Sequence, residues 1–163
     1  KNTLWLDSKN INKLENCKFA QDWLSQNSGK FSSLLVETPT NSIKNADNPE
    51  WIQCIKKING TSNVQVGYYL PTNLLKDCVN NNLSRSECKK QFLRIAKFLK
   101  NIEVSSITFD YLGYDLIKNE NLFKDFKWHI WHVNSLNAFN DIVSNENIGI
   151  VLLKNNKFTN NLN

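Results

Sequence analysis

The stretch IWHVNSLNAFNDIVSNENIGIVLL, residues 130–153, decides the fold class of this chain. Two short apolar runs, residues 130–133 and 148–153, flank a segment whose apolar side chains recur at helical spacing. Asn134 or Ser135 follows the first run at the position of a helix N-cap. The stretch therefore predicts a strand, a helix and a second strand that lies parallel to the first.

The same alternation recurs along the rest of the chain. Strands are predicted at residues 4–6, 34–36, 64–70, 107–109, 130–133 and 148–153, and helical patterns at residues 19–24, 51–58, 92–99 and 138–143. Pro49 opens the second helix, where its missing N–H costs nothing, and Ser84 with Glu87 three residues later forms a capping box for the third. These signals predict an α/β fold of parallel strand–helix repeats in a single domain, residues 1–163.

Two architectures are compatible with such repeats: an open doubly wound sheet, and part of a barrel of strand–helix units. A complete barrel needs roughly 250 residues, whereas this chain has 163. No glycine-rich loop follows a predicted strand, so the nucleotide-binding fingerprints of open sheets are missing. The residues by themselves leave both architectures open.

The charge distribution and the hydropathy of the chain argue against nucleic-acid binding and against a membrane span. The formal net charge of +5 comes from scattered lysines, and the densest clusters, Lys56-Lys57 and Lys89-Lys90, are only pairs. Because no aromatic side chains are interleaved with them, we expect no nucleic-acid groove. No apolar run approaches the roughly 18 residues that a bilayer span requires, so we expect no transmembrane helix.

The redox state of the cysteines would indicate the cellular compartment of the protein. The chain has four of them, Cys17, Cys54, Cys78 and Cys88. None forms a C-x-x-C pair, and only two histidines could join them, so a structural zinc site is not expected. Cys78 and Cys88 bracket a short polar segment that a disulfide could close, which favours an oxidising compartment and a secreted or periplasmic protein. The alternative is four reduced, partly buried thiols.

Functional groups of parallel α/β folds collect at the carboxyl ends of the strands. Asp7 and Lys9 end the first predicted strand and share a face by strand alternation. Such a pair can hold a divalent cation and neutralise a phosphate charge, or it can be an ordinary ion pair. Glu37, Asp110 and Asp115 supply further carboxylates at the same edge, or cap the helices that follow.

The two histidines, His129 and His132, lie in the fifth predicted strand. Alternation places them on opposite faces of the sheet, so they are not expected to share one proton or one metal ion. Each by itself is either a functional side chain or a hydrogen-bonded structural histidine.

Two segments carry a family resemblance. LWLDSK, residues 4–9, resembles the middle strand of glycerophosphodiester phosphodiesterases, where an acidic residue and a lysine alternate at the strand end. WHIWHVN, residues 128–134, followed by a helix and by IGIVL, residues 148–152, resembles the closing stretch of the same family. The resemblance implies strands four to eight of a TIM-type barrel.

The resemblance also implies roles for particular residues. Asp7 is expected to bind a metal ion, Ca²⁺ or Mg²⁺, and Lys9 to act in catalysis by stabilising charge on the phosphoryl oxygens. Trp131 is expected to line the substrate pocket, and His132 beside it is assigned to the same pocket. The implied reaction is general acid–base hydrolysis of a phosphodiester small molecule or lipid head group, assisted by the divalent cation.

The sequence departs from the family pattern in its histidines. The His-Arg-Gly segment and the second histidine of the family are missing, and His132 stands where threonine is usual. We therefore expect either an N-terminal half-barrel segment that completes the site, or a catalytically inactive relative that binds a phosphorylated or glycan ligand.

Overall fold

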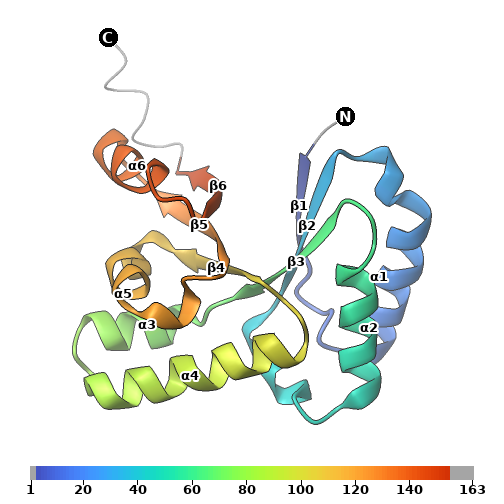
Figure 1. The fold of residues 1–163 in the computed structure, drawn as a ribbon, viewed down its shortest axis with the longest axis horizontal. Helices are drawn as coiled ribbons and strands as arrows, with labels where there is room; N and C mark the ends of the chain where they lie inside the picture. Colours follow the sequence, from blue (N-terminus) through green and yellow to red (C-terminus); the bar gives the residue numbers. More distant parts are fainter. Residues whose placement is uncertain (1–2, 155–163) are drawn as a thin grey trace. The chain divides into compact units, whose positions relative to one another are not determined.

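The computed structural model describes residues 3–154, in which strands and helices alternate (Figure 1). The strands are Thr3–Asp7 (β1), Ser33–Thr38 (β2), Val64–Tyr69 (β3), Ser106–Asp110 (β4), Lys127–Val133 (β5) and Ile148–Leu153 (β6). The α-helices are Leu14–Asn27 (α1), Pro49–Asn59 (α2), Thr72–Val79 (α3), Arg85–Asn101 (α4), Tyr114–Asn119 (α5) and Leu136–Val143 (α6). The 3-10 helices are Ser28–Lys30 (η1), Thr40–Asn45 (η2), Tyr111–Gly113 (η3) and Asn121–Phe123 (η4).

The strands follow one another across the sheet in sequence order, β1-β2-β3-β4-β5-β6. β1 pairs with β2, β2 with β3 and β5 with β6, each in parallel, and a helix connects every pair of consecutive strands. The prediction of an α/β fold with parallel strand–helix repeats is therefore confirmed. Doubly wound sheets reverse their strand order at a switch point, whereas the order of this sheet does not reverse.

The chain divides into two compact units. Unit 1 comprises residues 1–69 and 91–106, and unit 2 comprises residues 70–90 and 107–163. β1, β2 and β3 belong to unit 1, and β5, β6 and α6 belong to unit 2.

In unit 1 the apolar face of α2 forms the centre of the core. Trp51, Ile55 and Ile58 are fully buried, and the Trp51 ring stacks on Phe98 with 6.2 Å between ring centroids. The Trp51 indole N–H donates to the Ile11 carbonyl at 2.9 Å, so this large side chain is buried without an unsatisfied donor.

Helix starts agree with the signals read from the sequence. Pro49 is the first residue of α2, and the Asn48 side chain accepts a hydrogen bond from the Trp51 N–H at 3.2 Å. The Ser84 hydroxyl accepts from the Glu87 N–H at 3.2 Å at the start of α4. Of the two candidate caps of α6, Ser135 is the one that bonds, since its hydroxyl accepts from the Ala138 N–H at 3.1 Å.

Aromatic side chains fill the core of unit 2. Trp128 of β5 meets Phe109 and Tyr114 edge to face, with 6.0 and 6.4 Å between ring centroids. The Trp128 indole N–H donates to the Phe123 carbonyl at 2.9 Å. This core fixes β5 against the carboxyl end of β4, where the candidate active site lies.

Two disulfides stabilise the chain, one in each unit. Cys78–Cys88 confirms the pairing predicted for the short polar segment, and Cys17–Cys54 joins α1 to α2. The alternative of four reduced thiols is therefore wrong. No helix in residues 3–154 is long and apolar enough to cross a membrane.

Candidate active site

The carboxyl ends of β4 and β5 bring a histidine and a carboxylate together. Asp110 is the last residue of β4, and His132 lies one residue before the end of β5. The His132 Nδ1 and the Asp110 Oδ2 are 2.9 Å apart. His132 is expected from the sequence to belong to the site, and Asp110 is its structural partner.

Backbone contacts hold the Asp110 carboxylate in place. Its Oδ1 accepts a hydrogen bond from the Leu112 N–H at 3.0 Å, which caps the 3-10 helix η3. Its Oδ2 faces His132, and only 12% of the side chain is exposed. One carboxylate oxygen thus fixes the side chain to the backbone while the other orients the imidazole ring.

His132 occupies an unusual backbone conformation. Its φ of 60° lies in the left-handed region, which non-glycine residues rarely adopt. The register between β5 and β6 shifts between Ile130 and Val133, so the strand is irregular where His132 lies. Strain of this kind collects at functional sites because the surrounding structure holds a side chain in a required place.

The contact between Asp110 and His132 fixes the chemistry of the imidazole. A carboxylate accepts hydrogen bonds, so Nδ1 carries the proton that it donates to Asp110, and Nε2 is left to exchange a proton with a ligand. The His132 side chain is 46% exposed, which gives a ligand access to it. The Trp131 ring lies against His132 with 4.0 Å between ring centroids and forms an apolar wall beside the imidazole.

Tyr111 is a neutral phenol next to this pair in the sequence. Burial raises the pKa of its hydroxyl, and the charges of Asp141 and Asp115 raise it further. The Tyr111 ring also stacks on Tyr114 with 6.0 Å between ring centroids. Tyr111 can therefore donate a hydrogen bond at neutral pH, but it does not supply a negative charge.

Asp7 and Lys9 lie at the carboxyl end of β1, in unit 1. The Lys9 Nζ is 3.7 Å from the Asp7 Oδ2, and the two side chains are 82% and 59% exposed. Lys9 lies in the turn that follows the strand, so strand alternation does not apply to it, and the two side chains form an ion pair. An exposed pair of this kind contributes little to stability, because water and salt screen the attraction.

A second carboxylate in unit 1 is buried rather than exposed. Glu37 is the register neighbour of Asp7 on β2, so their side chains lie on the same face of the sheet. The Trp5 indole N–H donates to the Glu37 Oε2 at 2.8 Å. The sequence predicted Glu37 as a carboxylate at the strand ends, but it did not predict the hydrogen bond from the Trp5 indole.

A divalent cation needs several oxygen or nitrogen ligands around one point. Within residues 3–154, no three side chains of the types His, Cys, Asp or Glu gather in that way. The Asp7 carboxylate is exposed and paired with Lys9. The described residues thus do not fit a complete metal site, and the metal-binding role of Asp7 stays a prediction.

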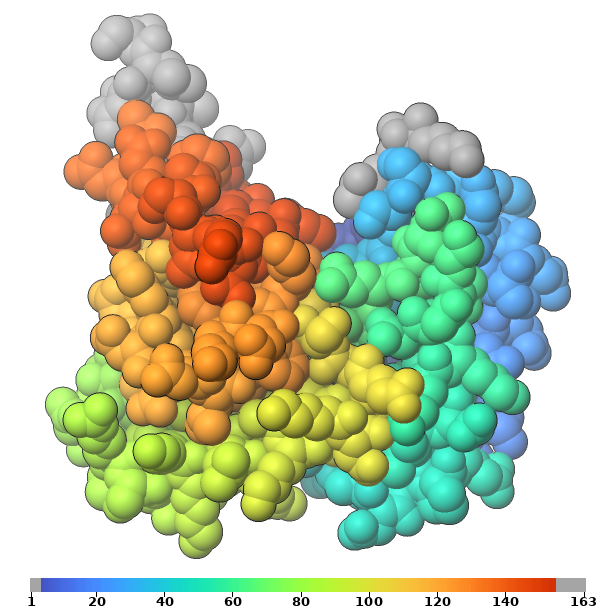
Figure 2. All heavy atoms as spheres, viewed as in Figure 1, coloured from blue at the N-terminus to red at the C-terminus, as the bar shows by residue number. Residues whose placement is uncertain are grey.

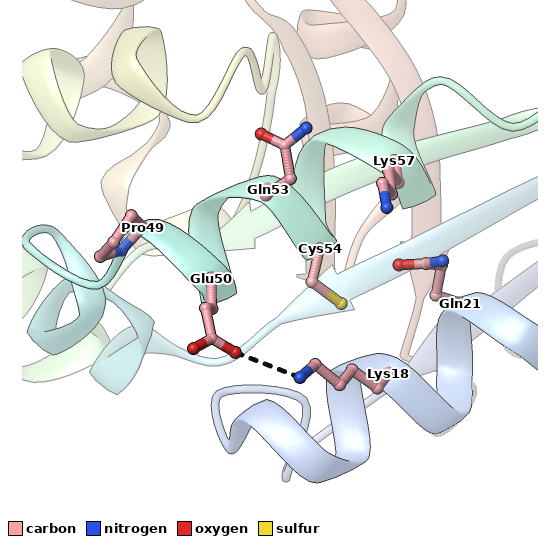
Figure 3. A pocket seen from close by; sticks show the side chains of 7 residues that line it. All are labelled: Lys18, Gln21, Pro49, Glu50, Gln53, Cys54 and Lys57. Carbon is pink, nitrogen blue, oxygen red and sulfur yellow. Dashed lines mark hydrogen bonds and ion pairs between the residues drawn. The ribbon is translucent and has the colours of Figure 1, made fainter.

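Unit 1 also contains an open cleft of about 410 Å³ beside the Cys17–Cys54 disulfide (Figure 3). The cleft is lined by Lys18, Gln21, Pro49, Glu50, Gln53, Cys54 and Lys57. Lys18 and Glu50 form an ion pair at 3.2 Å across it, as the dashed line in Figure 3 shows. Its cysteine is oxidised, and the lining holds no histidine, so we place the candidate active site at the Asp110–His132 pair instead.

His129, the other histidine of β5, is buried in unit 2 and is only 2% exposed. Gly149 of β6 makes room for its ring, since a Cβ at that position would lie 2.6 Å from the His129 Cε1. Burial and, to a smaller extent, the charge of Lys127 lower the pKa of His129 to about 4. At neutral pH, His129 is therefore an uncharged core residue.

This pKa predicts how the stability of the protein depends on pH. An unfolded histidine titrates near pH 6.5, whereas folded His129 stays neutral down to about pH 4. Between these values the unfolded chain binds a proton that the folded chain does not bind. We therefore expect the His129 contribution to the free energy of unfolding to fall by about 3 kcal/mol as the pH falls through this window.

Urea unfolding at a series of pH values checks this expectation. In the variant His129→Leu, the free energy of unfolding should lose this part of its pH dependence between pH 6.5 and 4. Equal slopes in this window for the wild type and the variant would contradict it.

Comparisons of the chain with family models, with curated proteins and with solved structures find no match. The site is therefore interpreted from its own geometry and chemistry.

Proposed function

We propose that this chain hydrolyses phosphodiesters of the glycerophosphodiester type, with the His132–Asp110 pair as an acid–base centre. The observation that carries the proposal is the 2.9 Å contact between the His132 Nδ1 and the Asp110 Oδ2. A half-exposed imidazole held by a fixed carboxylate is the usual arrangement of a general base. Its position at the carboxyl ends of adjacent strands is where parallel α/β folds bind substrates.

In the proposed step, His132 Nε2 takes a proton from the attacking water as the oxygen of that water bonds to phosphorus. Asp110 stabilises the imidazolium that forms, because its carboxylate lies against the protonated Nδ1. The bond between phosphorus and the leaving oxygen then breaks, and that oxygen leaves with the electron pair and takes a proton from solvent water. An in-line displacement places the water and the leaving oxygen on opposite sides of phosphorus, so His132 does not serve both.

Other side chains have proposed roles that follow the family resemblance. Trp131 provides an apolar wall for the glycerol or head group, which its contact with the His132 ring supports. The resemblance would assign stabilisation of phosphoryl charge to Lys9 and a Ca²⁺ or Mg²⁺ ligand to Asp7. These residues belong to different units, with Asp7 and Lys9 in unit 1 and Trp131 and His132 in unit 2.

The six strands fit the proposal that the chain is the C-terminal part of an eight-stranded barrel, completed by an N-terminal half-barrel segment. β6 ends the strand order and has no charged residue, and its Leu152 and Leu153 are exposed. Edge strands that face water usually have charges that discourage further pairing. The composition of β6 therefore supports a further strand beside it, with apolar side chains on both of its faces.

The disulfides support a proposed location outside the reducing cytoplasm, in a secreted or periplasmic protein. The phosphodiester would then be a small molecule or a lipid head group that is present in that compartment.

The proposal is tested with bis(p-nitrophenyl) phosphate as substrate, with and without added Ca²⁺ or Mg²⁺. Hydrolysis that is lost in His132→Ala and reduced in Lys9→Ala is the expected result. Native mass spectrometry of the same sample tells whether a second polypeptide accompanies the chain. Turnover that is equal in the wild type and in His132→Ala would refute the acid–base role.

A catalytically inactive relative that binds a phosphorylated or glycan ligand is the second candidate function. The exposed Asp7–Lys9 ion pair favours it, because neither side chain is held in a fixed geometry by buried contacts. Calorimetric binding of glycerol 3-phosphate, combined with no hydrolysis at any metal concentration, would support this function over the first.

A further inference from the structure

Two segments of the chain match the acceptor sequence for asparagine-linked glycans, Asn-x-Ser/Thr. They are Asn59-Gly60-Thr61 and Asn82-Leu83-Ser84. Such matches arise by chance in a chain rich in asparagine, so the sequence does not distinguish them. The structure places the two asparagines in very different surroundings.

Asn59 is a structural residue at the end of α2. Its Nδ2 donates to the Glu103 carbonyl at 2.9 Å, and its Oδ1 accepts from the Val66 N–H at 2.9 Å. The Thr61 hydroxyl of the same motif donates to the Lys57 carbonyl at 3.0 Å. Asn59 is half-buried, and its amide bonds to β3 and to the chain after α4 at once, so a glycan on its nitrogen would have to fit between these packed segments.

Asn82 lies instead in the turn between α3 and α4, and its side chain is exposed. The segment around residue 80, coloured yellow-green, lies at the surface of unit 2 in Figure 2. The Asn82 Nδ2 donates a hydrogen bond to the Asp77 Oδ1 at 3.2 Å. An amide nitrogen carries two hydrogens, so replacing one of them by a sugar leaves the other for Asp77.

The turn itself is fixed independently of the Asn82 side chain. The Cys78–Cys88 disulfide closes it, and the backbone N–H groups of Asn82 and Leu83 both donate to the Asp77 carbonyl, at 2.8 and 3.2 Å. The Ser84 hydroxyl caps α4 at the surface. A glycan at Asn82 therefore extends into solvent without disturbing a contact of the core.

We propose that Asn82 is an N-glycosylation site of this protein and that Asn59 is not. The disulfides indicate an oxidising compartment, where such transfer takes place in cells that have the transferase. The donor is an oligosaccharide linked to a lipid through a diphosphate. The Asn82 amide nitrogen bonds to the anomeric carbon of the donor, the bond from that carbon to the lipid diphosphate breaks, and the diphosphate leaves with the electron pair. The amide proton passes to a base of the transferase.

The test is secretion of the chain from yeast or insect cells, followed by intact mass measurement before and after peptide N-glycosidase. Proteolytic mapping then reports the occupancy of each asparagine separately. We expect a glycan on the peptide that contains Asn82 and none on the peptide that contains Asn59. Asn82→Gln should remove the mass shift, and Ser84→Thr, which preserves both the hydroxyl cap and the acceptor sequence, should retain it.

Two outcomes overturn the proposal. One is secreted, disulfide-bonded chain whose Asn82 peptide carries no glycan. The other is folded chain with a glycan on Asn59, which would show that the hydrogen bonds of that side chain do not exclude modification. The experiment is independent of phosphodiester hydrolysis, so failure of the proposed function leaves it unaffected.

Discussion

Replacing His132 with alanine is expected to lower the rate of phosphodiester hydrolysis by about a hundredfold to ten-thousandfold, the usual contribution of a general base. The reason is that Nε2 of this ring is the nitrogen that Asp110 leaves free to take the proton of the attacking water. Rates of bis(p-nitrophenyl) phosphate cleavage by the wild type and the variant, at equal concentrations of folded protein, measure the effect.

Three controls separate a chemical role from a structural one. Added imidazole should restore part of the activity of His132→Ala, because a small base can occupy the space left by the ring. Asp110→Asn should also lose activity, since an amide does not stabilise the imidazolium that forms as a carboxylate does. Asp125→Asn changes an exposed carboxylate outside the site and should leave the rate unchanged. Loss of activity without rescue, accompanied by a lower unfolding temperature, would indicate that His132 acts only in the fold.

Removing the Cys17–Cys54 disulfide is expected to produce the second large effect, on stability. The bond closes a loop with a sequence separation of 37 residues, compared with 10 for Cys78–Cys88. Because the longer loop restricts the unfolded chain more, its loss should lower the free energy of unfolding by about 4 kcal/mol, against about 3 kcal/mol for the shorter one.

The double variants Cys17→Ala/Cys54→Ala and Cys78→Ala/Cys88→Ala provide the comparison, with unfolding in urea followed by circular dichroism. Alanine is preferred to serine because these positions are buried and a hydroxyl there would need a partner. An equal loss in the two variants, or a larger loss for Cys78–Cys88, would contradict the loop-length argument.

Local signals in the sequence predicted the larger elements well. Pro49 and the Ser84–Glu87 capping box predicted helix starts correctly, because caps depend on residues within one turn of each other. The short helices α3 and α5 were not predicted, because the six residues of α5 are too few to show a helical stripe and α3 has no side-chain cap to mark its start. Cys78–Cys88 could be predicted because its ends are close in the sequence, whereas Cys17–Cys54 depends on how α1 packs against α2.

The candidate site was predictable only in part. Asp110 and His132 were recognisable as residues at strand ends, but their contact depends on the backbone of β5. The sequence of β5 has the pattern of a regular strand, so it does not reveal the positive φ of His132 or the register shift beside it. Long-range contacts set such irregularities, and the pattern of apolar residues does not encode them. The Trp5–Glu37 hydrogen bond was missed for the same reason, because it depends on how two neighbouring strands are aligned.

The placement of the two disulfides has a consequence for how the protein acquires its covalent structure. Four cysteines can pair in three ways, and only the observed pairing keeps both bonds inside their own units. Either of the other two isomers would tie unit 1 to unit 2 twice, through cysteines that the native fold buries in separate units. Such isomers would be kinetic traps of oxidative folding. Efficient production of this chain should therefore depend on a disulfide isomerase that can undo the wrong pairs.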